Sequence, residues 1–277
     1  MSEELRLRIV SGIVLAVVVL VSTWYGGIGF RLLAAAISLL VYYEWSTITK
    51  LAEKDFQANA IGWLGTALVA AVTVLGEFDY AIPLLLIFTV LTAILSGLRR
   101  GSWWLPGGVF YSALSGISLA AIRGEDSVGL AAMLFVFAVV WATDILAYFV
   151  GRAVGGPKLA PKISPGKTWS GAIGGTISGV IAGTAVALVQ FPNTGIWVAC
   201  IALLLSVSSQ VGDLFESFLK RRFGVKDSSR LIPGHGGVMD RVDGLVFACF
   251  AAFLLAIGLA ATRGDPAASL GGLLLGL

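Results

Sequence analysis

The sequence predicts an all-α, polytopic membrane protein with about nine transmembrane helices and a cytoplasmic N-terminus. Of its 277 residues, 57% are hydrophobic and only 13% are charged, and the mean hydropathy of +0.92 is too high for a soluble core. Apolar stretches of about 17 to 25 residues, each able to cross the hydrocarbon layer as a helix, recur along the whole chain. If these stretches cross a membrane in turn, almost all Lys and Arg residues fall on one side of it, which sets the expected orientation.

The nine apolar stretches are separated by short polar segments. The first follows a charged start that contains Arg6 and Arg8, and it lacks a small-residue cleavage pattern, so we expect it to be a retained helix. The expected spans lie near residues 8–27, 28–49, 59–77, 80–97, 104–122, 128–150, 170–190, 195–219 and 243–262.

The basic residues predict which side of the membrane each connection occupies. With nine spans, all but three of the 19 Lys and Arg residues share one side, the exceptions being Arg31, Arg123 and Arg263. The positive-inside rule makes that side cytoplasmic, so we expect a multi-pass protein of the cytoplasmic (inner) membrane. Topology and anionic lipid account for these charges, and nucleic-acid binding is therefore not expected.

Two regions are expected along the chain. Residues 1–122 form N-terminal membrane helices that embed the protein and frame a cavity, and residues 123–277 form a C-terminal catalytic region. Two long connections, 151–169 and 220–242, carry most of the residues that could bind a ligand or take part in a reaction. Both fall on the cytoplasmic side, where we expect the active site.

Four acidic residues lie at or within the spans: Glu44, Asp144, Asp213 and Glu216. A charge in hydrocarbon is costly, so each is a candidate functional residue. Glu44 and Glu216 could equally pair with interfacial Lys or Arg, and Glu216 stands four residues before Lys220. Asp144 and Asp213 have no basic partner within one helical turn, which favours a functional role.

The sequence "DRVD" places Asp240 and Asp243 three residues apart, on one face of a helix if the ninth span begins there. Clustered carboxylates suit a hard cation such as Mg²⁺, which is held by a few acids together with substrate phosphates. Asp213, near the end of the preceding helix, strengthens this interpretation. The alternative is that Arg241 simply forms a solvated salt bridge with its neighbours.

The segment "GHGG" precedes the same helix. Its backbone amides, leading into a helix N-terminus, are a natural site for phosphate oxygens. We expect His235, the only histidine, to bind phosphate or organise the loop, because no serine or cysteine nucleophile lies beside it. Further cationic donors are Lys220, Arg221, Lys226 and Arg230, although membrane anchoring would explain some of them equally well.

The connection "PKLAPKISPGKTWSG" contains "GKT" but is not a Walker A loop, because Pro161 occupies the place of the required glycine. We expect a helix entry with Ser164 as the cap, a proline in the first turn and Lys167 as a phosphate ligand. The following helix carries glycines at 171, 175, 179 and 183. This spacing predicts a close-packing face, within the chain in preference to a dimer seam.

The stretch "SFLKRRFGVKDSSRLIPGHGGVMDRVD", from Ser217 to Asp243, resembles the signature of the phosphatidate cytidylyltransferase family: S-x-x-K-R, then K-D, then P-x-H-G-G-x-x-D-R-x-D. Every fixed position matches. The resemblance extends more loosely to "WATDILAYFVGR" and "ISPGKTWSG". The family commonly has lysine where this chain has Gly166, and glutamate where it has Ser170.

The resemblance implies transfer of the cytidylyl group of CTP to phosphatidic acid, in phospholipid biosynthesis, with Mg²⁺ and K⁺ as cofactors and a possible homodimer. It implies that Asp213, Asp240 and Asp243 are catalytic acids at the metal and that Lys220 and Arg221 are catalytic cations. The substrate-binding residues that we expect are Asp144, Ser164, Lys167, Thr168, Lys226, Asp227, His235, Gly236, Gly237 and Arg241.

Two other functions remain open at this point. A CTP-dependent lipid kinase would use the same residue types but would transfer the γ-phosphate. An ion-coupled transporter would use the intramembrane acids as an ion path, but those acids gather at one face and the two halves show no inverted repeat.

Overall fold

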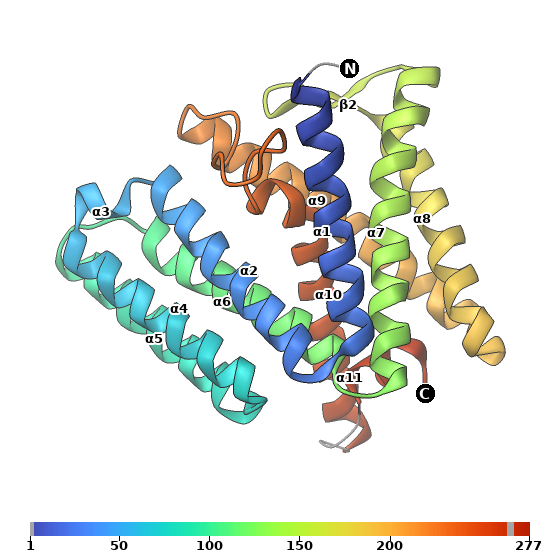
Figure 1. Ribbon diagram of the computed structural model, residues 1–277, viewed down its shortest axis with the longest axis horizontal. Coiled ribbons are helices and arrows are strands. Elements are labelled where there is room, and N and C mark those ends of the chain that lie inside the picture. The colour runs from blue at the N-terminus through green and yellow to red at the C-terminus, as the bar shows by residue number, and fades with distance from the viewer. Residues whose placement is uncertain (1–2, 265–268) are drawn as a thin grey trace. The chain divides into compact units, whose positions relative to one another are not determined.

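The computed structural model describes residues 3–264 and 269–277 and is almost entirely helical (Figure 1). In these ranges nine helices are long and apolar enough to cross a membrane, which confirms the prediction of an all-α polytopic protein. The spanning helices are α1 (Glu3–Tyr25), α2 (Gly27–Ile48), α4 (Phe56–Leu75), α5 (Phe78–Leu98), α6 (Trp104–Arg123), α7 (Ser127–Val154), α8 (Trp169–Gln190), α9 (Gly195–Arg222) and α10 (Met239–Arg263).

Several short elements were not predicted. They are the helical turn α3 (Leu51–Lys54), the antiparallel strands β1 (Lys158–Ala160) and β2 (Ser164–Thr168), the 3₁₀ turn η1 (Pro192–Thr194) and the helix α11 (Leu270–Leu275). Each is shorter than the apolar stretches that reveal a spanning helix. The hairpin β1–β2 matters most, because it lies within the long connection 151–169.

The chain forms two compact units. The first contains Met1–Ala120 and Phe223–Arg241, and the second contains Ala121–Arg222 and Val242–Leu277. The division after Ala120 lies close to the predicted boundary at residue 122. Residues 223–241, which the sequence assigned to the C-terminal region, pack within the first unit.

In the first unit, α2 packs against α4, and α4 packs against α5. The buried side chain of Trp45 anchors α2, because its Nε1 donates a hydrogen bond of 2.8 Å to the carbonyl oxygen of Trp104. Phe223, at the start of the returning segment, stacks edge-on against Trp104 with 5.2 Å between ring centroids. The segment 223–241 is thus tied to the N-terminal helices from its first residue.

In the second unit, α7 and α8 run side by side (Figure 1). The four glycines of α8, at 171, 175, 179 and 183, are all buried. A Cβ added to Gly175 would lie 2.6 Å from the carbonyl oxygen of Thr143 on α7. This contact confirms the prediction that the glycine face packs within the chain, since only glycine permits so close an approach.

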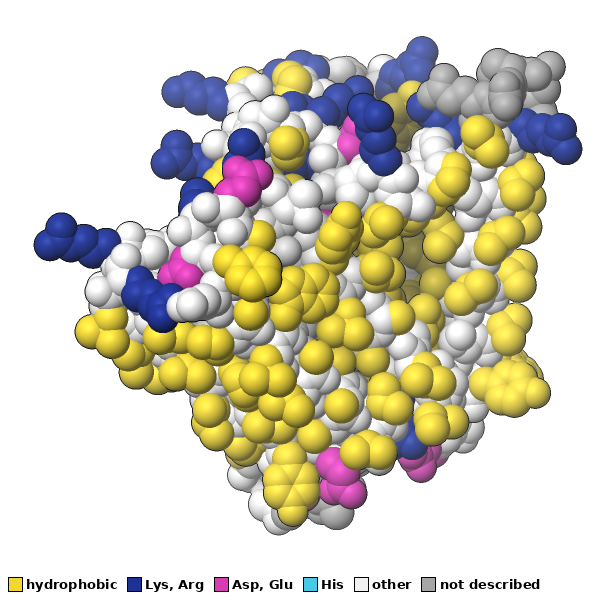
Figure 2. All heavy atoms as spheres, turned by 60° about the vertical axis from the view of Figure 1, so that its left-hand side comes forward, with side chains coloured by type: hydrophobic (Ala, Val, Ile, Leu, Met, Phe, Trp, Pro, Cys, Tyr) yellow, Lys and Arg dark blue, Asp and Glu magenta, His cyan; other side chains and the backbone are white. Residues whose placement is uncertain are grey.

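The outer surfaces of the helices are apolar. Hydrophobic side chains cover most of the surface that Figure 2 shows. On α8, Ile173, Ile177 and Ile181 recur every four residues and are each more than half exposed. Such faces are typical of helices that contact lipid.

Candidate active site

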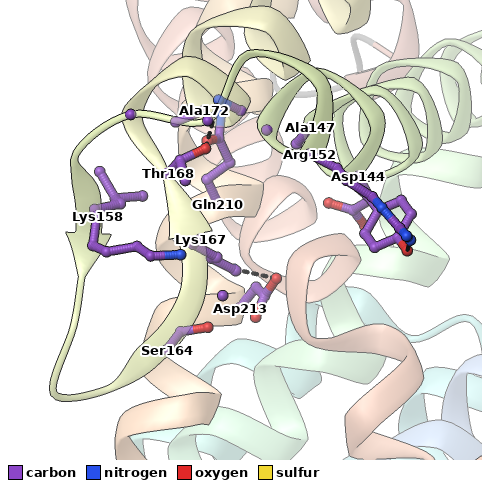
Figure 3. A pocket seen from close by; sticks show the side chains of 17 residues that line it. Asp144, Ala147, Arg152, Lys158, Ser164, Lys167, Thr168, Ala172, Gln210 and Asp213 are labelled. Carbon is purple, nitrogen blue, oxygen red and sulfur yellow. Dashed lines mark hydrogen bonds and ion pairs between the residues drawn. The ribbon is translucent and has the colours of Figure 1, made fainter.

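A cavity of about 630 Å³ opens in the second unit, between α7, the β1–β2 hairpin, the start of α8 and α9. Of the residues that the sequence singled out, it brings together Asp144, Ser164, Lys167, Thr168 and Asp213. Figure 3 shows Lys158, Ser164 and Lys167 on the hairpin, with Asp144 and Arg152 on the opposite wall. The cavity therefore joins the two sequence motifs upstream of the signature to Asp213, which shortly precedes it.

Lys167 and Asp213 form an ion pair at the centre of this cavity (Figure 3). Lys167 belongs to β2 and Asp213 to α9, so the contact joins the hairpin to a spanning helix. Their side chains are 29% and 31% exposed, which leaves both accessible to a ligand. An ammonium group that is held by a carboxylate can exchange that partner for a phosphate oxygen.

The predicted helix entry at Ser164 is wrong. Residues Ser164–Thr168 form strand β2, which pairs with β1 through Lys158 opposite Thr168 and Ala160 opposite Ser164. Helix α8 begins only at Trp169. Its cap is Thr168, whose Oγ1 accepts a 3.1 Å hydrogen bond from the amide of Gly171. The strand carries Lys167 into the cavity, whereas the predicted helical turn would have placed its side chain near the amides of a helix N-terminus.

The polar cavity residues that the sequence did not indicate include Arg152, Lys158 and Gln210. Arg152 lies in the last turn of α7 and donates a 2.9 Å hydrogen bond to the hydroxyl of Tyr148. The positive-inside rule explains Arg152 and Lys158 as membrane-anchoring charges. Their positions in "VGR" and "PKLAPK", on either side of a glycine turn, distinguish them from the other basic residues near the spans. With Lys167 they put three cations around the cavity, against the two acids Asp144 and Asp213.

The acids of the second unit lie near one another. Asp144, Asp213 and Asp243 are close enough for their charges to interact with each other and with Lys167. Among the described residues, no three His, Cys, Asp or Glu side chains form a metal site on their own. Mg²⁺ does not require one, because it commonly takes one or two carboxylates and completes its shell with water and substrate phosphates. The donor set of Asp213 and Asp243 fits that chemistry.

Asp240 lies in the first unit and organises the signature loop. Its Oδ2 accepts three hydrogen bonds, each of 2.8 Å, from the amide and the hydroxyl of Ser228 and from the amide of Gly237. The carboxylate therefore ties the beginning of the loop to its end. Asp240 and Asp243 both lie on α10, as predicted.

The expectation that the "GHGG" amides are open to phosphate is wrong for the residues next to α10. The amide of Gly237 donates to Asp240, and those of Val238 and Met239 donate to Glu44 at 2.8 and 2.6 Å. Protein carboxylates thus satisfy the helix N-terminus. Any substrate contact of Gly237 would not involve its amide. Gly236 remains a predicted contact.

His235 forms a hydrogen bond with Ser11 of α1. Its Nδ1 lies 2.8 Å from the hydroxyl of Ser11, which also donates to the carbonyl oxygen of Pro233 at 3.0 Å. Burial of the ring, together with the positive charges of Arg241 and Arg8, lowers the pKa of His235. The imidazole is therefore neutral at pH 7, which agrees with a loop-organising role.

The remaining predicted cations differ in their surroundings. Lys220 forms a 2.7 Å ion pair with the buried carboxylate of Glu216, which was one of the two alternatives that the sequence left open for this acid. Glu44 shows no such pairing in the part of the chain that the structure describes and accepts hydrogen bonds from the signature loop instead. The exposed residues of the predicted set are Arg221, Lys226, Asp227, Arg230 and Arg241.

The spanning helices and the cation-lined cavity define an integral membrane protein that can bind a polyanion. Residues 6–258 match the cytidylyltransferase family. The chain is 43% identical over 252 residues to a phosphatidate cytidylyltransferase of Brucella abortus biovar 1 (strain 9-941), covering 91% of this chain and 93% of that protein. The chain belongs to the cytidylyltransferase family.

More distant bacteria provide similar relatives. The phosphatidate cytidylyltransferase of Bacillus subtilis (strain 168) is 33% identical over 270 residues, covering 92% of this chain and 98% of the relative. That of Haemophilus influenzae is 33% identical over 279 residues, with 88% and 96% covered. The similarity thus extends through both units.

Proposed function

We propose that this chain is a phosphatidate cytidylyltransferase, which converts phosphatidic acid and CTP into CDP-diacylglycerol and pyrophosphate. The observation that carries the proposal is the cavity in which Lys167 and Asp213 form an ion pair, with Arg152 and Lys158 on its walls. Relatives of this name that cover almost the whole chain support it.

The reaction needs no protein nucleophile. A phosphate monoester has a second pKa of about 6, so phosphatidic acid brings its own attacking oxygen to neutral pH. That oxygen forms a bond to the α-phosphorus of CTP. The bond from this phosphorus to the bridging oxygen breaks, and its electron pair leaves with pyrophosphate. The protein's task is to hold two polyanions in line and to offset their repulsion.

The residues of the cavity suit this task. The Lys167 ammonium would move from Asp213 to a phosphate oxygen, while Arg152 and Lys158 would hold neighbouring oxygens. Arg guanidinium groups bind phosphate through paired hydrogen bonds, and lysines act as point charges. Asp213, once released by Lys167, could accept a cation that accompanies the nucleotide.

We propose Mg²⁺ as that cation, with Asp213 and Asp243 as the residues that would hold it. When bound, it would draw negative charge from the phosphate oxygens. Asp240 remains a predicted ligand, although one of its oxygens already accepts three hydrogen bonds. A role for K⁺ also remains a prediction.

The placement in the membrane is part of the proposal. The distribution of Lys and Arg supports a cytoplasmic N-terminus and a site on the cytoplasmic side of the inner membrane. CTP would enter from that side, and the phosphate of the lipid lies at the same depth. A homodimer is likewise proposed from the family resemblance alone.

Labelled CTP separates this reaction from lipid phosphorylation. Purified protein is incubated with phosphatidic acid and CTP labelled at either the α or the γ phosphorus, with and without Mg²⁺. Cytidylyl transfer puts the α label into the lipid product. Appearance of the γ label in lipid would identify a kinase, and product formation without any divalent cation would remove Mg²⁺ from the proposal.

The acid Asp213 offers a direct test of the site. The Asp213→Asn substitution keeps the size of the side chain but removes its charge, so we expect nearly complete loss of turnover in a protein that still inserts and folds. Normal turnover of this variant at ordinary Mg²⁺ concentration would exclude the assignment.

A further inference from the structure

Both carboxylate oxygens of Glu44, a residue of α2 that the proposed chemistry does not use, accept hydrogen bonds. Its side chain is fully buried. Oε1 accepts hydrogen bonds from the hydroxyl of Ser229 at 2.6 Å and the amide of Val238 at 2.8 Å. Oε2 accepts from the amide of Met239 at 2.6 Å and lies 3.0 Å from the hydroxyl of Ser228, whose one proton it shares with Asp240 Oδ2. All four donors lie in the signature segment.

These bonds connect parts of the chain that are far apart in sequence. The donors stand 184 to 195 residues after Glu44. Two of them precede the "GHGG" turn and two follow it, so one carboxylate closes the loop from both sides. The amides of Val238 and Met239 begin α10, and Glu44 therefore caps that helix from another element, a role that a neighbouring Ser, Thr or Asp usually fills.

Gly237 is explained by the same contact. A Cβ on Gly237 would collide with Glu44 Oε1 and with the hydroxyl of Ser228. The backbone torsion φ of Gly237 is not in the left-handed region, unlike that of Gly236 at 84°. Gly237 is therefore required for space, so that the carboxylate can approach the loop.

Burial makes the contact decisive for the loop. A buried carboxylate is costly unless donors satisfy it, and here all four come from one segment. Hydrogen bonds to a charged acceptor are about twice as strong as neutral ones. The loop conformation that satisfies Glu44 also fixes Ser228 against Asp240, and Arg230 and His235 lie in the segment between these two residues.

We propose that Glu44 is a positioning residue, which holds the signature loop in the conformation that the cytidylyl-transfer reaction uses. The proposal rests on the assignment of residues 226–241 to the active site. Glu44 contacts no substrate itself. It acts through the loop, whose lysine, arginine and histidine side chains are the predicted phosphate contacts.

The contact can be broken from either side. Glu44→Gln keeps the shape of the side chain but turns an amide group toward donors, and Gly237→Ala displaces the carboxylate from the loop side. Two matched controls change the same chemistry elsewhere in the first unit. Glu53→Gln alters an exposed acid, and Gly97→Ala adds a methyl group where nothing lies within 4 Å.

The full-length variants are purified in detergent and assayed with CTP and phosphatidic acid. We expect Glu44→Gln and Gly237→Ala each to lower kcat/KM about ten- to hundredfold, since hydrogen bonds to charged groups are lost. A raised KM for CTP or phosphatidic acid is the decisive readout. A smaller folded fraction lowers only the apparent kcat, whereas a displaced phosphate-binding loop raises KM.

Tryptic cleavage after Lys226 and Arg230, located by mass spectrometry, measures the loop directly. We expect both Glu44→Gln and Gly237→Ala to be cleaved there faster than the wild type, while the two controls behave like the wild type. Unchanged cleavage and unchanged kinetics in both variants would overturn the proposal. Faster cleavage with unchanged kinetics would overturn it too, because the loop would then move without consequence for the reaction.

Failure of the proposed function has a different signature. Wild-type protein would then form no CDP-diacylglycerol, whereas the cleavage rates would still report whether Glu44 holds the loop. Loss of activity in Glu44→Gln with normal KM and normal cleavage would also count against the positioning role, since neither the loop conformation nor substrate binding would then depend on Glu44.

Discussion

Replacing Lys167 with methionine tests the site through a change whose effects on activity and stability should differ sharply. Lys167→Met keeps the aliphatic side chain but removes the ammonium group that pairs with Asp213. A hydrogen bond to a charged group contributes about 1.5 to 3 kcal/mol. With a tenfold effect for each 1.4 kcal/mol, we expect kcat/KM for CTP to fall about ten- to hundredfold. The assay is the initial rate of CDP-diacylglycerol formation at varied CTP.

The stability of the same variant should hardly change. The side chains of Lys167 and Asp213 are about one third exposed, and ion pairs screened by solvent contribute only about 0 to 1 kcal/mol. Thermal unfolding in detergent measures this difference. The matched control is Lys162→Met, since Lys162 is an exposed lysine of the same hairpin turn and does not line the cavity. An unchanged kcat/KM in Lys167→Met, or an equal loss in Lys162→Met, refutes the reasoning.

Three further predictions concern packing, capping and pH. Gly175→Ala should destabilise the protein by about 1 to 3 kcal/mol, because its methyl group would meet a carbonyl oxygen of α7 at 2.6 Å. Thermal unfolding should show a lower Tm for this variant. The Tm of the control Gly258→Ala, whose added methyl group meets nothing within 4 Å, should not fall. Thr168→Ala should cost about 1 kcal/mol through loss of the α8 cap, and Thr168→Ser, which retains the hydroxyl, should unfold like the wild type. Because the folded protein lowers the pKa of His235, protonation favours the unfolded chain, so stability should fall as the pH drops below about 6.5. In His235→Asn, the free energy of unfolding should change less with pH in that range. If stability still falls with pH as it does in the wild type, the effect belongs to another group.

The spanning helices could be predicted because their signal is local. Twenty consecutive apolar residues identify a helix whatever its neighbours are. Helical spacing likewise offered the ion pair of Glu216 with Lys220 as one of two alternatives. The β1–β2 hairpin could not be found, because "PKLAPKISPGKT" lacks the alternation of a half-buried strand. Its proline and serine match a helix entry equally well, which is why the cap was assigned to Ser164 instead of Thr168.

The site was only partly predictable, because its contacts join distant segments. Lys167 and Asp213 were each chosen from local patterns, but nothing in the sequence paired them. The partners of Glu44 lie more than 180 residues away, so an interfacial ion pair was the simpler expectation. Arg152 fell into the class of membrane-anchoring cations, since a charge count does not show which cations face a cavity.

The close contact of α7 with α8 has a consequence for movement. Because α8 presents glycine to α7 at four positions from Gly171 to Gly183, the two helices lie so close that they cannot slide or separate without losing this contact, and we expect them to behave as a single rigid plate. The cavity wall that carries Asp144 and Arg152 is part of that plate. The strand pair bearing Lys158 and Lys167 does not belong to this contact, so we expect it to adjust more readily than α7 to the bulk of an incoming lipid or nucleotide.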